Sequence, residues 1–311
     1  MVQTKVQTYG PAAIAAAAEL ILAGEPVAIP TETVYGLAAD ATNGEAVARI
    51  YAAKGRPSFN PLIVHVRDLD QALNIARFEP MALDLASRFW PGPLTLVLPL
   101  REDSMIAPLV TAGLPTVALR CPAHPAMRDL LKATARPLAA PSANASGRIS
   151  PTRAEHVLSS LGGRIRLVVD GGPTEHGLES TIVAVAGGKL RVLRPGPITL
   201  GDADADSSKI EAPGQMASHY APAKPLRLEA SEAASNEWLI GFDAVDGDSN
   251  LSATGDLIQA AANLFSALHD AEASNRPRIA VAPIPDVGLG KAINDRLRRA
   301  AAPQVHASLG G

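Results

Sequence analysis

The sequence predicts an α/β fold that is built on a mixed sheet and followed by a small second α/β domain. In the first two-thirds of the chain, short apolar runs alternate with helical patterns, which is typical of α/β proteins. The apolar runs are too numerous and too closely spaced for a purely parallel sheet, in which every connection needs a long crossover. Beyond a polar stretch that starts near residue 201, a strand–helix–strand–helix pattern indicates a separate βαβ-type unit.

The elements of the first domain follow in chain order. A proline in the first turn and a glycine at the end delimit a helix over 11–24, and a helix over 43–55 also ends at a glycine. Short strands are expected over 26–30 and, from the alternation of its apolar residues, over 61–66. The remaining strands are expected at 94–100, 115–120, 137–142, 166–170, 180–185 and 190–194, and the remaining helices at 80–89, 124–134 and 152–161.

The change in composition near residue 201 separates two domains. The first domain is expected over 1–203, and a linker over 204–225, where apolar periodicity is almost absent. The second domain is expected over 226–311. Its predicted elements are the strands 237–243 and 278–284 and the helices 255–273 and 288–301.

Composition and charge exclude several classes of protein. With a net charge of −3 and only 4% aromatic residues, the chain has no global basic field for nucleic acid and few stacking platforms. Cys121 is the only cysteine, which excludes an internal disulfide and a multi-cysteine metal site. No signal peptide and no membrane-spanning run is evident, so a cytoplasmic protein is expected.

Two cations lie at the end of the second helix and on the loop that follows it, which two prolines stiffen. Lys54 lies in the last helical turn, where it would also complement the helix dipole, and Arg56 follows a glycine. Asn60 lies on the same loop and His65 on the next strand, where a lone histidine is usually an ordinary strand residue. Because arginine offers a planar fork and lysine a point charge, this group is a candidate phosphate clamp.

Small hydrogen-bonding residues gather over 140–155, between an apolar strand and a helix. Ser142 and Ser150 belong to this group. Thr152 and Glu155 have the spacing of a capping box, so part of the group is expected to cap the helix. A polar loop that enters a helix N-terminus also binds phosphates, and no GxSxG motif marks Ser142 as a hydrolase nucleophile.

Two more polar groups lie at strand ends. The stretch 31–35 follows a buried strand with hydroxyl and carboxyl side chains, which fits either a polar turn or the wall of a pocket. Ser180 opens one strand and Arg194 ends another, although a terminal arginine is usually solvated. The sequence has no P-loop, HExxH, CxxC or EF-hand motif, and no GxGxxG follows a strand.

Taken together, these motifs resemble the YrdC-like threonylcarbamoyl-AMP synthases. The resemblance covers roughly residues 10–200, and the stretch HYAP with the C-terminal unit is similar to the two-domain branch of that family. It implies a twisted mixed sheet with a concave active site and a small Rossmann-like C-terminal domain. The motifs, in order, are PTETVYGL, KGRPSFNPLIVH, PGPLTLVL, VALRCP, APSANASGRISPT, ESTIV and LRPGPI.

The family's reaction joins L-threonine, bicarbonate or carbon dioxide, and ATP into threonylcarbamoyl-AMP with release of pyrophosphate. The resemblance implies Mg²⁺ held mainly by the ATP phosphates, and no dedicated acidic cluster is evident. A separate transferase complex then modifies tRNAs that read codons beginning with A. A weak contact with tRNA itself is left open.

The resemblance also assigns residues to the two substrates. It implies that Lys54 and Arg56 act catalytically on the phosphates, that the linker is a lid, and that Thr31, Glu32 and Tyr35 support Thr33. The residues implied for L-threonine are Thr33, His65, Arg120, Ala140 and Ser180. The residues implied for ATP are Lys54, Arg56, Asn60, Thr116, Ser142, Ser150, Arg194 and Tyr220.

Three other functions compete with this one. A module that binds double-stranded RNA or tRNA without turnover would need a locally basic surface, against the net charge of −3. A carbamoyl-transferring maturation factor would carry cysteine-rich zinc modules, against the single cysteine. A binding protein for an amino acid or nucleotide would be stabilised by its ligand and would form no product.

Overall fold

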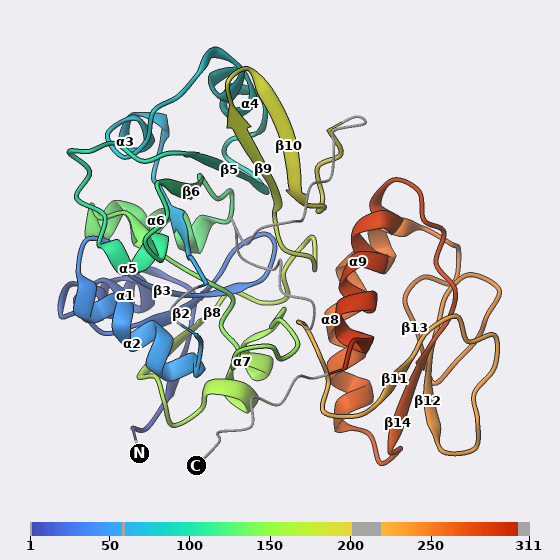
Figure 1. The fold of residues 1–311 in the computed structure, drawn as a ribbon. Coiled ribbons are helices and arrows are strands. Elements are labelled where there is room, and N and C mark those ends of the chain that lie inside the picture. The colour runs from blue at the N-terminus through green and yellow to red at the C-terminus, as the bar shows by residue number, and fades with distance from the viewer. Residues whose placement is uncertain (1, 58–59, 201–218, 304–311) are drawn as a thin grey trace, which may run out of the picture. The chain divides into compact units, whose positions relative to one another are not determined.

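The structure is a computed structural model that describes residues 2–57, 60–200 and 219–303 (Figure 1). Two compact units divide the chain. The first unit comprises residues 1–146 and 150–215, and the second comprises residues 147–149 and 216–311. Within the described ranges, no helix combines the length and the apolar character that crossing a bilayer requires.

Among its described residues, the first unit forms one ten-stranded sheet in the order β1-β8-β2-β3-β7-β4-β6-β5-β9-β10. The sheet contains both parallel pairs, such as β4 with β6, and antiparallel pairs, such as β5 with β6, so the predicted mixed sheet is confirmed. The strands are β1 (Lys5–Thr8), β2 (Val27–Pro30), β3 (Tyr35–Asp40), β4 (Ile63–His65), β5 (Leu94–Pro99), β6 (Thr116–Arg120), β7 (Leu138–Ala139), β8 (Leu167–Asp170), β9 (Thr181–Ala186) and β10 (Lys189–Arg194).

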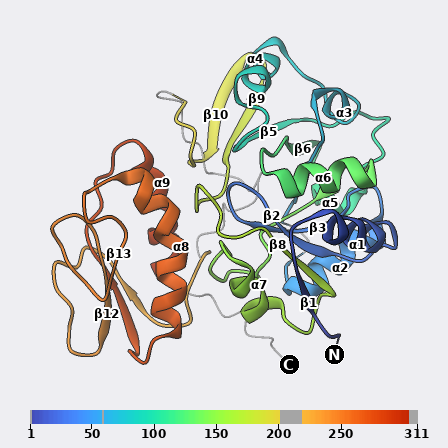
Figure 2. The same cartoon turned by 180° about the vertical axis from the view of Figure 1, so that it is seen from behind.

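Helices cover both faces of this sheet. On one face α1 and α6 lie side by side (Figure 2) and share a core with alternate residues of β2 and β8. The other helices of the unit contribute to a second core, which contains the intervening strand residues. The helices are α1 (Pro11–Leu22), α2 (Gly44–Lys54), α3 (Leu69–Leu73), α4 (Pro80–Phe89), α5 (Pro108–Thr111), α6 (Pro125–Thr134) and α7 (Ala154–Leu161).

The local signals that predicted these helices hold for α2 and fail for α7. Asn43 caps α2 by accepting from two backbone N–H groups, and Gly55 ends the helix at a φ of 60°. The predicted capping box at 152–155 is wrong, because α7 begins only at Ala154. The Thr152 hydroxyl and N–H lie instead at 3.4 and 3.3 Å from Nδ1 of His156.

Strand β3 is an element that the sequence patterns did not predict. It is buried on both faces and therefore lacks the apolar–polar alternation of a half-exposed strand. Gly36 lies within it, and a Cβ there would approach Cβ of Ala140 to 3.3 Å, so a larger residue would require Ala140 to shift slightly. The turn at 31–34 is thus the connection of a hairpin between β2 and β3.

The second unit is a small Rossmann-like domain, as predicted. Its described strands form a parallel sheet in the order β11-β14-β12-β13. Residues 204–218 of the predicted linker and lid lie outside the described residues, and the part from 219 onward belongs to this unit. The elements are β11 (Leu226–Arg227), β12 (Glu237–Gly241), β13 (Ser249–Asn250), β14 (Arg278–Val281), α8 (Leu257–Ala273) and α9 (Leu289–Ala301).

Candidate functional site

A buried arginine at the end of β6 organises one half of the site. The Arg120 guanidinium donates from Nη1 to the Thr33 hydroxyl at 2.8 Å and from Nη2 to Oε1 of Glu32 at 2.5 Å. Its Nε donates to the Gly92 carbonyl at 3.2 Å. The Thr33 hydroxyl also lies 2.8 Å from that of Thr31, which ties the β2–β3 turn together. The turn and the strand end therefore meet through one cation.

Glu32 is ionised in this environment. Burial alone would raise its pKa, but the charge and hydrogen bonds of Arg120 outweigh burial and lower the pKa to about 2. Its second oxygen, Oε2, accepts from the backbone N–H groups of Ala123 and His124 at 3.1 and 3.2 Å. His124 is the N-cap residue of α6, so the carboxylate also complements the positive end of that helix.

His65 lies beside this group on the neighbouring parallel strand. The register of β4 and β6 pairs it directly with Arg120. The imidazole is buried, and among the described residues its Nδ1 has no hydrogen-bond partner. Burial, followed by the charge of Arg120, lowers the pKa of His65 to about 3, so the ring is neutral at physiological pH.

The neutral state of His65 predicts acid sensitivity. Because its folded pKa is depressed to about 3, His65 favours the folded protein fully above pH 6.5 and progressively less as the pH falls from 6.5 toward 3. We expect the wild type to lose about 2 kcal/mol more free energy of unfolding than His65→Gln between pH 7.5 and pH 5. Urea titrations at the two pH values measure this difference. His176→Gln, at a half-buried position, should behave as the wild type, and equal losses in all three proteins would contradict the prediction.

Ser180 and Arg194 come together at the start of β9. The Arg194 guanidinium donates to the Ser180 carbonyl from Nε and Nη2 at 3.1 and 2.9 Å, and to its hydroxyl at 3.1 Å. That hydroxyl also lies 2.7 Å from the hydroxyl of Thr95 on β5. Arg194 is buried, so the usual solvated position of a terminal arginine does not apply here.

Lys54 contacts the loop that follows β7. Its ammonium donates to the carbonyls of Ser142 and Asn144 at 2.6 and 2.5 Å. Burial, and then the nearby charge of Arg56, holds the pKa of Lys54 well below its usual range. The two predicted groups, 54–65 and 140–150, are therefore parts of one site, joined by a contact between residues about 90 positions apart in the chain.

Arg56 lies on the loop between α2 and β4. It donates to the carbonyls of Asn60 and Pro61 at 3.3 and 3.0 Å, and the Tyr51 hydroxyl donates to the same Asn60 carbonyl at 3.0 Å. Asn60 is buried. These contacts fix the Arg56 side chain against Asn60 and Pro61, with a second cation close to Lys54.

Ser150 and Ala140 also lie beside these groups. The Ser150 hydroxyl donates to Oε1 of Glu179 at 2.5 Å, and Glu179 directly precedes Ser180. Ala140 donates its N–H to the Ile63 carbonyl at 3.0 Å, next to β4. The buried carboxylate of Glu179 is thus close to a hydroxyl of the predicted nucleotide group.

Two other predicted residues have different surroundings. Thr116 begins β6, whereas Arg120 ends it, which places them roughly 13 Å apart along the strand. Tyr220 belongs to the second unit, where it is buried against Phe265 at a ring distance of 5.7 Å. The Arg296 guanidinium lies 5.4 Å from the centre of the same ring. The nucleotide role of Tyr220 stays a prediction.

Three residues that contact the predicted site residues were not assigned to the site from the sequence. Thr95 lies in a buried strand, where a hydroxyl needs a partner, so its position in PGPLTLVL was an available signal. Asn144 belongs to the polar group predicted over 140–155 but was not assigned to a substrate, and Glu179 was not singled out within its loop. Among the described residues, no group of three or more histidine, cysteine, aspartate or glutamate side chains could hold a metal ion.

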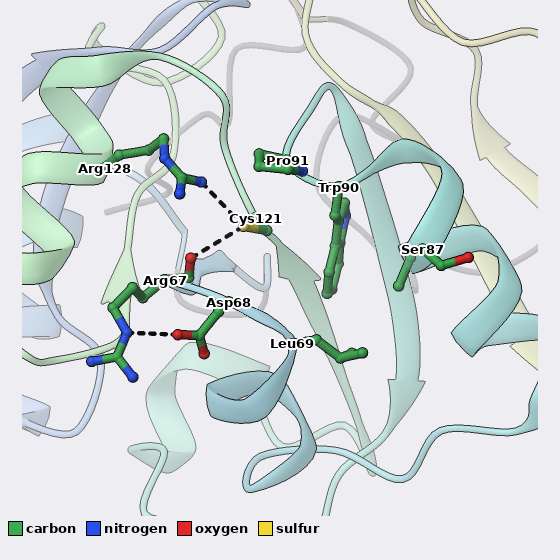
Figure 3. A pocket seen from close by; sticks show the side chains of 9 residues that line it. Arg67, Asp68, Leu69, Ser87, Trp90, Pro91, Cys121 and Arg128 are labelled. Atoms are coloured by element: carbon green, nitrogen blue, oxygen red, sulfur yellow. Dashed lines mark hydrogen bonds and ion pairs between the residues drawn. The ribbon is translucent and has the colours of Figure 1, made fainter.

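None of the predicted site residues lines a cavity of about 320 Å³ in the first unit. Its wall includes Cys121, which directly follows Arg120, and Trp90 at the end of α4. Figure 3 shows Arg128 directed toward the sulfur of Cys121, at 3.9 Å from Nη1. Cys121 is thus next to Arg120 in the chain, but the residues that line this cavity are not those of the predicted site.

Comparisons with known proteins agree on one family. A family model named for Sua5, YciO and YrdC and described as telomere recombination matches residues 19–196. A second model, described as the C-terminal domain of threonylcarbamoyl-AMP synthase, matches residues 178–302.

Individual relatives match over almost the full length. The chain is 41% identical to the threonylcarbamoyl-AMP synthase of Bacillus subtilis over 325 aligned residues, which cover 94% of each protein. It is 37% identical to that of Pyrococcus abyssi, over 93% of this chain and 94% of the relative. A crystal structure of P. abyssi Sua5 complexed with L-threonine matches with a TM-score of 0.86 and 36% identity, over 97% of each chain.

Proposed function

This chain belongs to the two-domain threonylcarbamoyl-AMP synthases, and from this membership we propose the reaction and the residues that carry it. The protein is an enzyme, and it is a threonylcarbamoyl-AMP synthase. The proposed reaction joins L-threonine, bicarbonate or carbon dioxide, and ATP, and releases pyrophosphate. The observation that carries the proposal is the buried Arg120, which is surrounded by groups that suit a small amino acid.

The proposed threonine subsite is centred on Arg120. A guanidinium has five N–H groups, and three of those on Arg120 donate to the described residues Gly92, Thr33 and Glu32. The other two suit the carboxylate of an amino acid. The neutral imidazole of His65 offers an additional polar atom without adding a second cation. The residues that we propose for L-threonine are Thr33, His65, Arg120, Ala140 and Ser180.

The proposed ATP subsite lies around Lys54 and Arg56. Their adjacent charges suit the phosphates, and the contact of Lys54 with the 142–144 loop supports a single cradle. Mg²⁺ would be held mainly by the phosphates, and the buried carboxylate of Glu179 is the kind of oxygen ligand it accepts. When bound, the ion would neutralise phosphate charge. The other residues that we propose for ATP are Asn60, Thr116, Ser142, Ser150, Arg194 and Tyr220.

The chemistry needs positioning more than a nucleophile. Carbamate that forms on the threonine amine is short-lived in water, so a buried site protects it and strengthens every charge contact within it. A carbamate oxygen would then attack the α-phosphate as pyrophosphate leaves. Lys54 and Arg56 would stabilise the developing charge, and no covalent enzyme intermediate is required.

The product implies a downstream partner. A transferase complex would move the threonylcarbamoyl group to tRNAs that read codons beginning with A, and these substrates fit a cytoplasmic reaction. A weak contact between this chain and tRNA is compatible with this sequence of events. Because the threonylcarbamoyl group finally reaches tRNA, a module that binds RNA without turnover is the strongest competing function.

The decisive experiment measures pyrophosphate release by the purified chain. We expect release only when ATP, L-threonine and bicarbonate are all present, with the adenylate detected by mass spectrometry. Omission of either L-threonine or bicarbonate should reduce release to the background. ATP that remains intact with all substrates present, together with tight and steeply salt-dependent RNA binding, would favour the RNA-binding alternative.

A further inference from the structure

We propose that Glu32 is a positioning residue for L-threonine, which acts by holding the guanidinium of Arg120 and does not itself contact the substrate. The inference rests on the proposed function, because it assigns a role within the proposed threonine subsite. Glu32 is 4% exposed and lies in the turn between β2 and β3. Both of its carboxylate oxygens form hydrogen bonds within the protein.

Both oxygens of Glu32 already have partners. Oε1 accepts from Nη2 of Arg120 at 2.5 Å, whereas Oε2 accepts from the N–H groups of Ala123 and His124 at 3.1 and 3.2 Å. The carboxylate therefore connects the end of β6 to the start of α6. Both oxygens are thus used in contacts within the protein, and their role in holding Arg120 favours an indirect effect on the substrate.

The consequence for Arg120 is a fixed orientation. Its guanidinium is held along three directions, by Gly92 through Nε, by Thr33 through Nη1 and by Glu32 through Nη2. A long flexible side chain is thereby ordered before the substrate arrives, and the conformational entropy is lost on folding and not on binding. Without Glu32, the Nη2 side of the fork would lack its only described partner.

The backbone around Glu32 is also fixed. The Glu32 carbonyl accepts from the N–H of His176 at 2.9 Å. The hydroxyl of Thr31 accepts from the N–H groups of Thr33 and Val34 at 3.2 and 3.3 Å. The side chain of Glu32 therefore starts from a turn that is anchored on both sides.

The contact of Glu32 with the start of α6 offsets the repulsion between Glu32 and a bound substrate carboxylate. When a substrate carboxylate approaches Arg120, two carboxylates share one guanidinium and repel each other. The two N–H groups at the start of α6 carry positive partial charge and stabilise the Glu32 carboxylate independently of Arg120. Glu32 can thus remain ionised and in place while the Arg120 guanidinium binds a second anion, the substrate carboxylate.

The test is Glu32→Gln, which keeps the shape of the side chain and removes its charge. We expect calorimetry to show an L-threonine Kd that is raised about 10- to 100-fold, with KM for L-threonine rising in parallel. The KM for ATP and the kcat at saturating L-threonine should stay within about threefold of the wild type. The preference for L-threonine over L-threoninamide should fall, because this preference reports the orientation of the Arg120 fork.

Two further variants keep the proposal falsifiable. Glu32→Asp retains the charge on a shorter side chain, so if Glu32→Gln fails to fold, a several-fold rise in the L-threonine Kd of Glu32→Asp gives the same evidence. Glu102→Gln, at an exposed position, is the matched control and should change neither constant. An unchanged L-threonine Kd in the folded variants, or equal weakening of L-threonine and ATP, overturns the proposal. Wild-type turnover without L-threonine would overturn the proposed function instead.

Discussion

Arg56→Ala is expected to lower kcat/KM for pyrophosphate release by roughly 10²- to 10³-fold, the loss typical of removing one preorganised donor to developing charge. The reason is the position of Arg56 beside Lys54, where the two cations would meet the phosphates together. Steady-state pyrophosphate release with varied ATP measures the effect. Arg56→Lys should recover only part of the activity, because an ammonium lacks the planar fork of arginine.

The fold should survive the loss of Arg56. The residue holds its own loop through the carbonyls of Asn60 and Pro61, whereas the Tyr51 hydroxyl provides an independent bond to Asn60. Circular dichroism and the melting temperature should therefore change little. Arg77→Ala, which removes an exposed arginine that pairs with Glu102, is the matched control. Full activity in Arg56→Ala would refute the phosphate role.

Arg120→Met is expected to remove detectable L-threonine binding and also to destabilise the protein. Loss of the guanidinium leaves the buried carboxylate of Glu32 without its cation, and breaking a buried pair in this way typically costs about 3–5 kcal/mol. Calorimetry with L-threonine and urea unfolding at pH 7.5 measure the two effects separately.

A double variant separates the two roles of Arg120. In Arg120→Met combined with Glu32→Gln, the unpaired buried charge is absent, so most of the lost stability should return. Threonine binding should not return, because the carboxylate partner is still missing. Recovery of binding in the double variant would show that Arg120 does not contact the substrate. Equal stability of the single and double variants would contradict the buried ion pair.

The substitutions at Arg56, Arg120, Glu32 and His65 each remove a different interaction. The Arg56 substitution removes a proposed phosphate contact, and the Arg120 substitution removes a proposed carboxylate contact. The Glu32 substitution leaves both contacts chemically present and changes only the orientation of one. The effect of the His65 substitution is measured as the pH dependence of the free energy of unfolding, so it does not depend on any substrate.

Much of the fold was predictable from local patterns. Proline and glycine signals marked helices such as α1 and α2, and the short apolar runs marked most strands of the mixed sheet. Where a strand is buried on both faces, as β3 is, the alternation that identifies a strand is absent. The start of α7 was misjudged because Thr152 pairs with His156 instead of capping the helix.

The sequence by itself determined the family, the mixed sheet and the second α/β unit, and it supplied the candidate residues for L-threonine and ATP that stay a prediction. Only the tertiary structure decided how those residues are held. The bonds of Arg120 to Glu32 and Thr33 join positions separated by 88 and 87 residues, and that of Lys54 to Asn144 joins positions separated by 90. Hydrophobic periodicity and turn signals describe neighbours in the chain, whereas these partners meet only when the strands pair and bury their polar ends together.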